Sequence, residues 1–256
     1  MYYQTESEGA DRWQVFVVSL RDATDRRDNI SKQLSELSIP FEFIDAVDGR
    51  TGLPVECEQL VDRVGTEVQF GRRMTDAEYA CALSHMSIYR LITEGGLPGA
   101  VILEDDAVIG PVFAKFYQNR GYERAVLIQL DHMHGDIWKF SKRMPLIEGV
   151  KLAKAARNTS LTTGYSISHR GAAYILENGL PLRGPADWPC DVTGLPTMLA
   201  LPRVVDHPAW ENSDSALEAA RGAIVSSATS EKRILLFLKR AYWRRWWFKR
   251  RTTRIS

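Results

Sequence analysis

The sequence predicts an α/β protein whose mostly parallel, twisted sheet is flanked by helices. Short apolar runs alternate along the chain with stretches of helical periodicity, a pattern typical of parallel strands connected by helices. Three consecutive acids directly follow one of the apolar runs, at the position where open α/β sheets bind their ligands. The chain has 256 residues, which is enough to bury a substantial core.

The first predicted strand and helix occupy residues 14–20 and 24–37. The strand is an unbroken apolar run, as expected when both faces are buried. The helix has Thr24 as a candidate N-cap, and Ile30 and Leu34 form an apolar stripe at helical spacing. This segment therefore predicts the opening of a strand–helix–strand unit.

A second short strand is predicted at 40–44, and a long helix follows it. Thr75 and Glu78 have the spacing of a capping box, so we expect the helix to begin there and to run to about Glu94. A glycine-rich break then leads into the apolar run 99–103, which precedes the three acids.

The remaining predicted elements are two strands and a helix, at 125–130, 161–167 and 171–180. There is no internal repeat and no clear linker before about residue 222. We therefore expect one large domain over 1–225 and a separate tail over 226–256.

The composition indicates a cytoplasmic protein. The N-terminus lacks a basic region followed by an apolar core, and no run approaches the length of a membrane span. The three cysteines have no metal-ligand spacing, which favours reduced thiols.

The acid cluster Glu104-Asp105-Asp106 is the strongest functional signal in the chain. Three adjacent carboxylates after a buried strand need a compensating charge. Glu104 and Asp106 are the alternate pair that could share one cation, and oxygen ligands suit Mg²⁺ or Mn²⁺. The alternative is an acidic turn exposed to solvent.

Six short segments, taken in order, resemble glycosyltransferase family 25, which contains bacterial lipopolysaccharide and lipooligosaccharide sugar transferases and related collagen galactosyltransferases. They lie at 17–27, 43–49, 75–85, 102–106, 164–172 and 185–187. Two positions depart from the usual pattern: Ser19 replaces Asn, and Ala80 replaces Gly. Neither change removes a charged group, so both affect fine contacts rather than the reaction.

The resemblance implies a GT-A fold and an inverting transfer of galactose or glucose from a UDP-sugar to a lipooligosaccharide- or lipopolysaccharide-type glycan. A divalent ion on Glu104 and Asp106 would neutralise the diphosphate of the donor. His207 follows a late strand and is a candidate third metal ligand.

We expect the donor to be bound by side chains from several strand ends. The candidate residues are Ser19, Leu20, Arg26, Arg27, Asp45, Val47, Asp48, His85, Asp105, Thr162, Thr163 and Gly164. The two arginines lie near a helix N-terminus, where phosphate is favoured, although both could instead be solvated. A turn-forming role explains Asp48 equally well, and a lone histidine such as His85 is often structural.

Inversion requires a base that removes the proton of the acceptor hydroxyl. Asp187 is our candidate, and Asp191 is the reserve.

The last 26 residues predict a basic amphipathic helix. Residues 231–256 hold ten of the 33 basic side chains but one of the 32 acids, so the remaining chain is acidic. At about 100° per residue, Leu235, Leu238, Tyr242 and Trp246 share one stripe and several arginines lie opposite. Such a helix suits the inner face of the cytoplasmic membrane. Single-stranded nucleic acid is the alternative partner, and the sugar-transferase resemblance favours the membrane.

Two other functions compete with sugar transfer. A catalytically inactive nucleotide-sugar-binding protein would share the fold, but the intact acid cluster argues against it. A metal-dependent nucleotidyltransferase would also use acids and arginines. The absence of a glycine-rich loop bearing Lys or Arg near residue 20 argues against that function.

Overall fold

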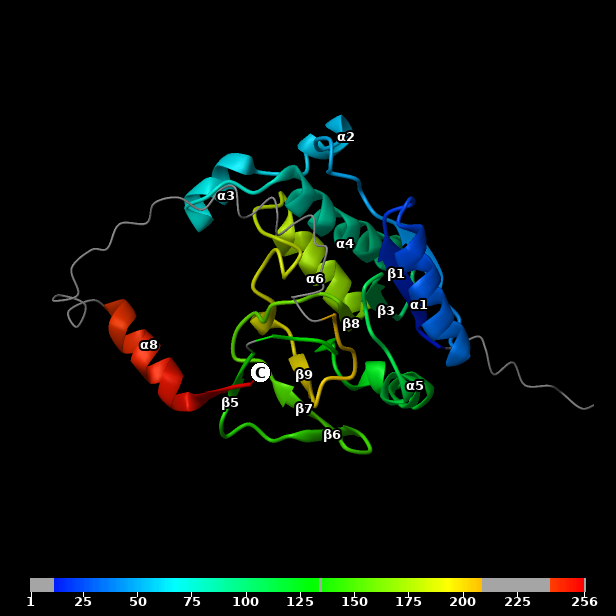
Figure 1. Cartoon of the computed structure of the whole chain (residues 1–256). Helices are drawn as coiled ribbons and strands as arrows, with labels where there is room; N and C mark the ends of the chain where they lie inside the picture. The colour runs from blue at the N-terminus through cyan, green and yellow to red at the C-terminus, as the bar shows by residue number, and fades with distance from the viewer. Residues whose placement is uncertain (1–11, 134, 209–239, 256) are drawn as a thin grey trace, which may run out of the picture.

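The computed structural model describes residues 12–133, 135–208 and 240–255, and for 240–245 it describes the backbone alone. Its main feature is an eight-stranded sheet in the order β2-β1-β3-β8-β4-β9-β7-β6 (Figure 1). The strands are β1 Gln14–Ser19, β2 Glu42–Asp45, β3 Gly99–Glu104, β4 Leu127–Gln129, β6 Met144–Ile147, β7 Val150–Lys154, β8 Gly164–Ser168 and β9 Thr197–Leu201. Six of them run in one direction, and β7 and β8 run in the other.

Helices cover both faces of the sheet. The helices of the described residues are α1 Thr24–Glu36, α2 Val55–Glu58, α3 Arg63–Phe70, α4 Asp76–Glu94, α5 Pro111–Gln118, α6 His169–Gly179 and α8 Arg240–Arg251, and those that pack on the sheet are α1, α4, α5 and α6. One core lies between the sheet and α1 with α5, and the other lies between the sheet and α4 with α6. The predicted α/β class with a sheet between helices is confirmed.

β1 shows why the apolar run is continuous. Val15 and Val17 pack in the α1–α5 core, whereas Phe16 and Val18 pack in the α4–α6 core. Alternate side chains of a strand point to opposite faces, so a strand covered on both faces needs apolar residues at every position. Each fully buried side chain of this size contributes about 1.5–3 kcal/mol.

The ends of the two long helices test the predicted caps. At α4, Thr75 and Glu78 form the predicted capping box, with both reciprocal hydrogen bonds present. At α1, Thr24 is the first helical residue and not the cap. The cap position is Ala23, whose side chain can make no capping hydrogen bond, so the prediction for Thr24 was wrong.

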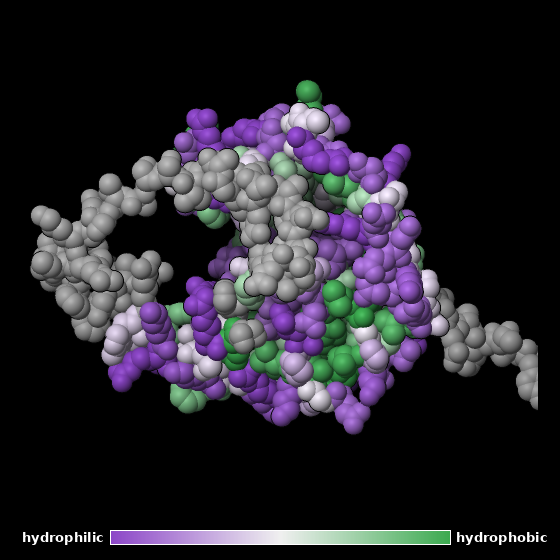
Figure 2. All heavy atoms as spheres, in the orientation of Figure 1, coloured by the Kyte–Doolittle hydropathy of each residue, from purple (hydrophilic) through white to green (hydrophobic). Residues whose placement is uncertain are grey.

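The outer surface fits this two-core arrangement. The face shown in Figure 2 is hydrophilic over α1, whose apolar residues Ile30 and Leu34 are fully buried. Within the described part of the chain, no helix combines the length and the apolar character that a membrane crossing requires.

The end of the chain returns to the body. Strand β10 (Thr252–Arg254) pairs antiparallel with β5 (Asp136–Trp138), and Figure 1 shows the chain running from α8 to this pair. Phe248 packs edge-on against Trp138, and Ile255 joins a small core with Leu199. Of the segment predicted as a separate tail, residues 226–239, including Leu235 and Leu238, lie outside the described residues. The amphipathic stripe therefore stays a prediction.

Candidate functional site

The predicted donor-site residues gather at one end of the strands, along the border of the sheet where three parallel strands finish. Strands β2, β1 and β3 all end there, with Ser19 opposite Asp45 and Val18 opposite Glu104. Strand β8 runs the other way, so it begins at this edge, and its Gly164 lies opposite Leu103. The four segments are brought together although they span almost 150 residues of sequence. We call this region the acid edge.

Glu104 is held by a chain of hydrogen bonds that reaches into the α4–α6 core. Its Oε1 accepts a hydrogen bond from Thr162 Oγ1 at 2.6 Å and lies 3.3 Å from His85 Nε2. On the other side of the ring, His85 Nδ1 lies 2.8 Å from the hydroxyl of Tyr165, which lies 2.8 Å from that of Tyr89. His85, Tyr165 and Tyr89 are buried, so this chain fixes the orientation of Glu104.

The pKa values of Glu104 and Asp106 are shifted in opposite directions. Burial raises the pKa of Glu104, but the hydrogen bond and charge of His85 outweigh it, with Thr162 assisting, and the pKa lies below its usual range. Burial, together with the charges of Glu104 and Asp105, raises the pKa of Asp106 to about 7. Asp106 Oδ1 is also buried without a hydrogen-bond partner among the described residues. A cation beside Asp106 would satisfy this oxygen and offset the crowded negative charge, so the carboxylates fit a divalent ion.

The predicted third ligand, His207, is tied to the acid edge through the backbone. Asp206 and Val108 exchange two hydrogen bonds, of 2.8 and 2.9 Å, which places His207 next to the turn that follows the acids. Its Nδ1 lies 2.8 Å from Asp131 Oδ2. Among the residues that the structure describes, no three His, Cys, Asp or Glu side chains form a ready-made metal site.

Asp105 faces α1. Its carboxylate accepts a hydrogen bond of 2.7 Å from the hydroxyl of Ser19 and forms an ion pair of 3.4 Å with Arg26. The Arg26 side chain remains about half exposed. Ser19, although it replaces the usual Asn of the family pattern, therefore anchors the middle acid.

The two predicted phosphate-binding arginines have different environments. Arg27 donates to the backbone carbonyls of Ser19 and Leu20, at 3.1 Å each, and its guanidinium lies 4.6 Å from the ring centre of Phe43. Arg27 therefore holds the ends of β1 and β2 together. Arg26 has the weaker ion pair and is the more exposed of the two, so it is better placed to contact a diphosphate.

The end of β2 and the turn after it are bound by two arginines that sequence reasoning missed, Arg21 and Arg50. Asp45 pairs with Arg21 as well as with Arg27, and hydrogen bonds from both arginines hold the pKa of Asp45 below its usual range. Asp48 pairs with Arg50, which lowers its pKa to about 2. Both acids are thus ionised and neutralised by neighbouring cations. For Arg50 the available signal was its position two residues after Asp48, whereas Arg21 lies 24 residues before Asp45 and gave no local signal.

Backbone contacts position Val47 and the segment before β8. The backbone amide of Val47 donates to the side-chain hydroxyl of Ser84 on α4, at 2.9 Å. The backbone carbonyl of Thr163 accepts a hydrogen bond from the amide of Glu104, also at 2.9 Å. A side chain at Gly164 would approach Val205 to 2.9 Å. Glycine at this position allows the segment that carries His207 to pack on the edge.

The two candidate bases differ in their surroundings. Asp187 is partly buried and accepts the amide of Leu161 at 3.1 Å. Because Leu161 precedes Thr162, this bond ties Asp187 to the acid edge. Asp191 is exposed and caps a short 3-10 helix through hydrogen bonds from the amide and hydroxyl of Thr193, at 2.9 and 2.7 Å. These contacts give Asp191 a local structural role.

Asp131 is a site residue that sequence reasoning missed. It follows β4, has no exposed surface, and contacts both His207 and Arg203. The available signal was an acid directly after a short apolar strand, the same pattern that singled out Glu104.

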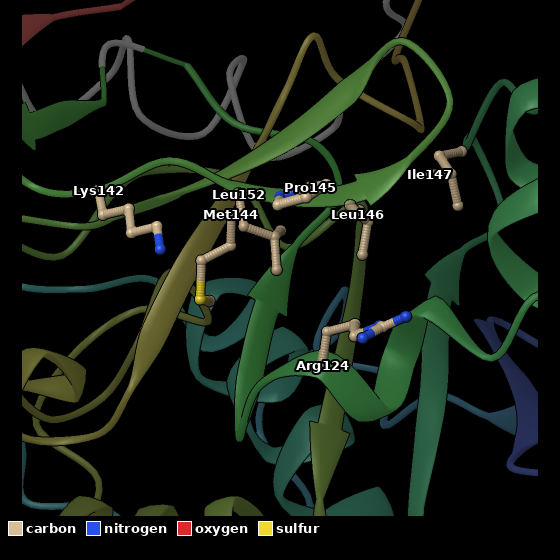
Figure 3. Close-up of a pocket in the computed structure, with 7 residues that line it drawn as sticks. All are labelled: Arg124, Lys142, Met144, Pro145, Leu146, Ile147 and Leu152. Atoms are coloured by element: carbon tan, nitrogen blue, oxygen red, sulfur yellow. The ribbon is translucent and has the colours of Figure 1, made fainter.

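A pocket of about 450 Å³ lies elsewhere, beside β6 (Figure 3). Its lining is apolar apart from Arg124 and Lys142. Because β6 is the outermost strand on the side of the sheet far from β1 and β3, the pocket lies away from the acids.

The large sheet between helices, with acids where β3 ends, is consistent with the GT-A-like fold. Residues 13–190 match the family described as Glycosyltransferase family 25 (LPS biosynthesis protein), and the chain belongs to this family.

Relatives fall into animal and bacterial groups. The chain is 30% identical over 179 residues to "Procollagen galactosyltransferase 1-A" of Xenopus laevis, a match that covers 66% of this chain and 28% of the relative. It is 28% identical over 160 residues to "Lipooligosaccharide biosynthesis protein lic2B" of Haemophilus influenzae, covering 60% of this chain and 58% of that protein. "Probable inactive glycosyltransferase 25 family member 3" of Bos taurus is 27% identical over 183 residues, covering 66% and 29%. The matches thus span less than two thirds of these relatives.

Proposed function

We propose that this protein is an inverting, metal-dependent glycosyltransferase. It would transfer galactose or glucose from a UDP-sugar to a glycan acceptor of the lipooligosaccharide or lipopolysaccharide type. The observation that carries the proposal is the buried oxygen of Asp106, which lacks a partner among the described residues and lies beside two further carboxylates. Family membership favours sugar transfer as the use of this site.

The metal-binding role falls to the acid edge. Glu104 and Asp106 would hold Mn²⁺ or Mg²⁺, with His207 as the third protein ligand. When bound, the ion would neutralise the diphosphate and stabilise it as a leaving group. His85 and Thr162 keep Glu104 oriented, and Arg26 supplies a further positive charge near the end of β1.

Asp187 is the proposed base. Inversion needs one in-line attack by the acceptor hydroxyl, and a carboxylate near that hydroxyl removes its proton. The hydrogen bond from the Leu161 amide fixes the Asp187 side chain next to the segment that orients Glu104. The remaining donor contacts are proposed for Ser19, Leu20, Arg27, Asp45, Val47, Asp48, Asp105, Thr163 and Gly164.

We also propose that α8 docks on the inner face of the cytoplasmic membrane. Trp246 and Trp247 are exposed, and the guanidinium groups of Arg250 and Arg251 lie over their rings. Aromatic rings with adjacent cations suit the headgroup layer of an anionic membrane. This would place the acid edge near a lipid-linked acceptor.

The decisive experiment measures UDP release by the full chain. UDP-galactose and UDP-glucose are supplied with an extracted lipooligosaccharide acceptor, with Mn²⁺, with Mg²⁺ or with EDTA. Acceptor-dependent release that EDTA abolishes supports the proposal. Donor binding without turnover, under all conditions, would identify a binding protein like the probable inactive relative. Release of pyrophosphate from a sugar phosphate and UTP would identify a nucleotidyltransferase.

A further inference from the structure

A phenylalanine lies at the tip of the turn that follows β5. The turn covers residues 138–141, and the carbonyl of Trp138 closes it by accepting hydrogen bonds from the amide of Ser141, at 3.3 Å, and from its hydroxyl, at 3.0 Å. Phe140 is 92% exposed, the highest value among the large apolar side chains that the structure describes. Turns usually carry Gly, Asn, Asp, Ser or Pro, so an exposed aromatic ring at this position points to a partner.

The surface around Phe140 is basic. Lys139 and Lys142 are exposed on either side of it, and neither has an ion-pair partner among the described residues. Residues 137–147 contain three basic side chains and no acid. We call residues 139–144 the basic turn. An exposed apolar ring between unpaired cations fits a surface that is anionic outside and apolar beneath, which describes a membrane containing anionic lipids.

The shape of the basic turn favours a membrane over other anionic partners. Single-stranded nucleic acid is bound by a positively charged groove with successive stacking platforms, whereas Phe140 is one ring at the tip of a four-residue turn. An acidic protein would need a pocket shaped to receive that ring. A fluid lipid layer needs no such pocket, because its headgroups move apart around an inserted side chain.

The backbone joins the basic turn to α8. The amide of Lys139 donates to the carbonyl of Arg251, the last residue of α8, at 2.9 Å. Trp138 pairs with Thr252 of β10 and packs edge-on against Phe248, with ring centres 5.9 Å apart. Figure 1 accordingly shows the connection from β5 to β6 beside the end of α8. The turn and the end of the helix therefore form one unit that can contact the same surface.

We propose that the basic turn is a second membrane-contacting element, in which Phe140 inserts among the headgroups of an anionic membrane while Lys139 and Lys142 pair with lipid phosphates. The inference rests on the proposed docking of α8 and adds a contact of another kind, because the helix lies along the surface and the turn enters it at one point. One helix alone leaves the protein free to rotate about the helix axis. A second contact fixes that rotation and so fixes the direction in which the acid edge faces.

The test measures sedimentation of the full chain with phosphatidylcholine vesicles that contain phosphatidylglycerol, at low and at high salt. Phe140→Ser should weaken binding about tenfold at both salt concentrations, because it removes apolar burial. Lys139→Gln with Lys142→Gln should weaken it about fivefold per cation at low salt and much less at high salt. Phe140→Trp should bind at least as tightly as the unsubstituted protein, because tryptophan favours the membrane interface.

The matched controls remove the same kinds of side chain elsewhere. Val68→Ser removes an apolar side chain that is 82% exposed on α3, which lies far from β6 in Figure 1. Lys32→Gln with Arg170→Gln removes two exposed cations from α1 and α6. Both controls should bind vesicles normally. All of these changes are on the surface, so every variant should keep its Tm and its rate of UDP release with a soluble acceptor.

Equal binding by Phe140→Ser and Val68→Ser would overturn the inference, and a loss in Lys249→Glu with Arg250→Glu alone would leave docking through α8 standing without the turn. A loss in the turn variants alone would support the turn and refute docking through α8. Turn variants that lose single-stranded DNA binding but keep vesicle binding would make nucleic acid the partner and overturn the inference. An unsubstituted protein that ignores vesicles would refute both contacts, while UDP release tests sugar transfer separately.

Discussion

The acid edge and the C-terminal region hold their charges in different ways. At the acid edge, side chains cross-link distant segments: Ser19 bonds Asp105 and Thr162 bonds Glu104. In the C-terminal region the attachment is mainly backbone pairing of β10 with β5, and the described side chains of α8 are largely exposed. Fixed, buried charge suits chemistry with defined geometry, whereas exposed cations and tryptophans suit a fluid surface. We therefore expect substitutions at the acid edge to abolish transfer without affecting vesicle binding, and substitutions on α8 to weaken vesicle binding without affecting transfer.

The largest effect is expected from neutralising the acid edge. Glu104→Gln with Asp106→Asn removes both carboxylates proposed to hold the cation and keeps the side-chain sizes. We expect a folded protein, by circular dichroism, that loses Mn²⁺-dependent donor binding and nearly all UDP release. The loss should exceed tenfold, which corresponds to about 1.4 kcal/mol in the barrier.

The matched control is Glu123→Gln with Glu148→Gln, two acids in exposed ion pairs away from this edge. It should keep the rate of the unsubstituted protein. If the acid-edge variant retained more than a tenth of that rate, the cation would have to be held elsewhere.

The second effect separates chemistry from donor binding within the acid edge. Asp187→Asn should preserve UDP-sugar affinity, measured by calorimetry, and lower kcat by 10²- to 10⁴-fold, because a base acts in the transition state. Weakened donor affinity with kcat intact would assign Asp187 to the donor pocket. A rate defect in Asp191→Asn alone would make the reserve acid the base, although its capping contacts with Thr193 favour a loss of local stability instead.

The parts of the acid edge that depend on a short stretch of sequence could be predicted from that stretch alone. An apolar run followed by acids identified the end of β3, and the spacing of Thr75 and Glu78 identified the start of α4. What escaped prediction depends on packing between distant segments. No local pattern shows that His85 reaches both Glu104 and Tyr165. The three-residue strands β5 and β10 are too short to show a period.

Packing also separates residues that the sequence makes equivalent. Arg26 and Arg27 are adjacent and identical, yet the structure uses Arg27 to hold two strand ends and leaves Arg26 about half exposed. Asp131 was missed because one acid after a short strand is a common pattern. Its importance arises only when the chain returns at His207, 76 residues later.

The third effect compares these two arginines. Arg26→Ala should raise the KM for the UDP-sugar about 10- to 100-fold, since a charged hydrogen bond contributes about 1.5–3 kcal/mol, with little change in Tm. Arg27→Ala should instead lower Tm by several degrees, because it removes two bonds to strand-end carbonyls and the contact with Phe43. Both are measured by thermal melting and steady-state kinetics. Because Arg27 is also a proposed donor contact, a rise in KM can accompany its loss of Tm. A donor-binding defect in Arg27→Ala with an unchanged Tm would contradict its role in holding the strand ends.

The smallest effect on transfer is expected in the C-terminal region. Truncating the tail would also unpair β5, so a charge reversal is the cleaner change. Lys249→Glu with Arg250→Glu alters two exposed cations of α8 and should weaken sedimentation with anionic vesicles at least tenfold, at about 1 kcal/mol per charge. UDP release with a soluble acceptor should stay within twofold.

The matched control is Lys151→Glu with Lys154→Glu, which makes the same charge change on β7 and should bind vesicles normally. Binding of the unsubstituted protein should weaken at high salt because screening reduces surface attraction. Equal sedimentation of both variants, or tight binding of single-stranded DNA without vesicle binding, would refute membrane docking through α8 and leave the acid edge untouched.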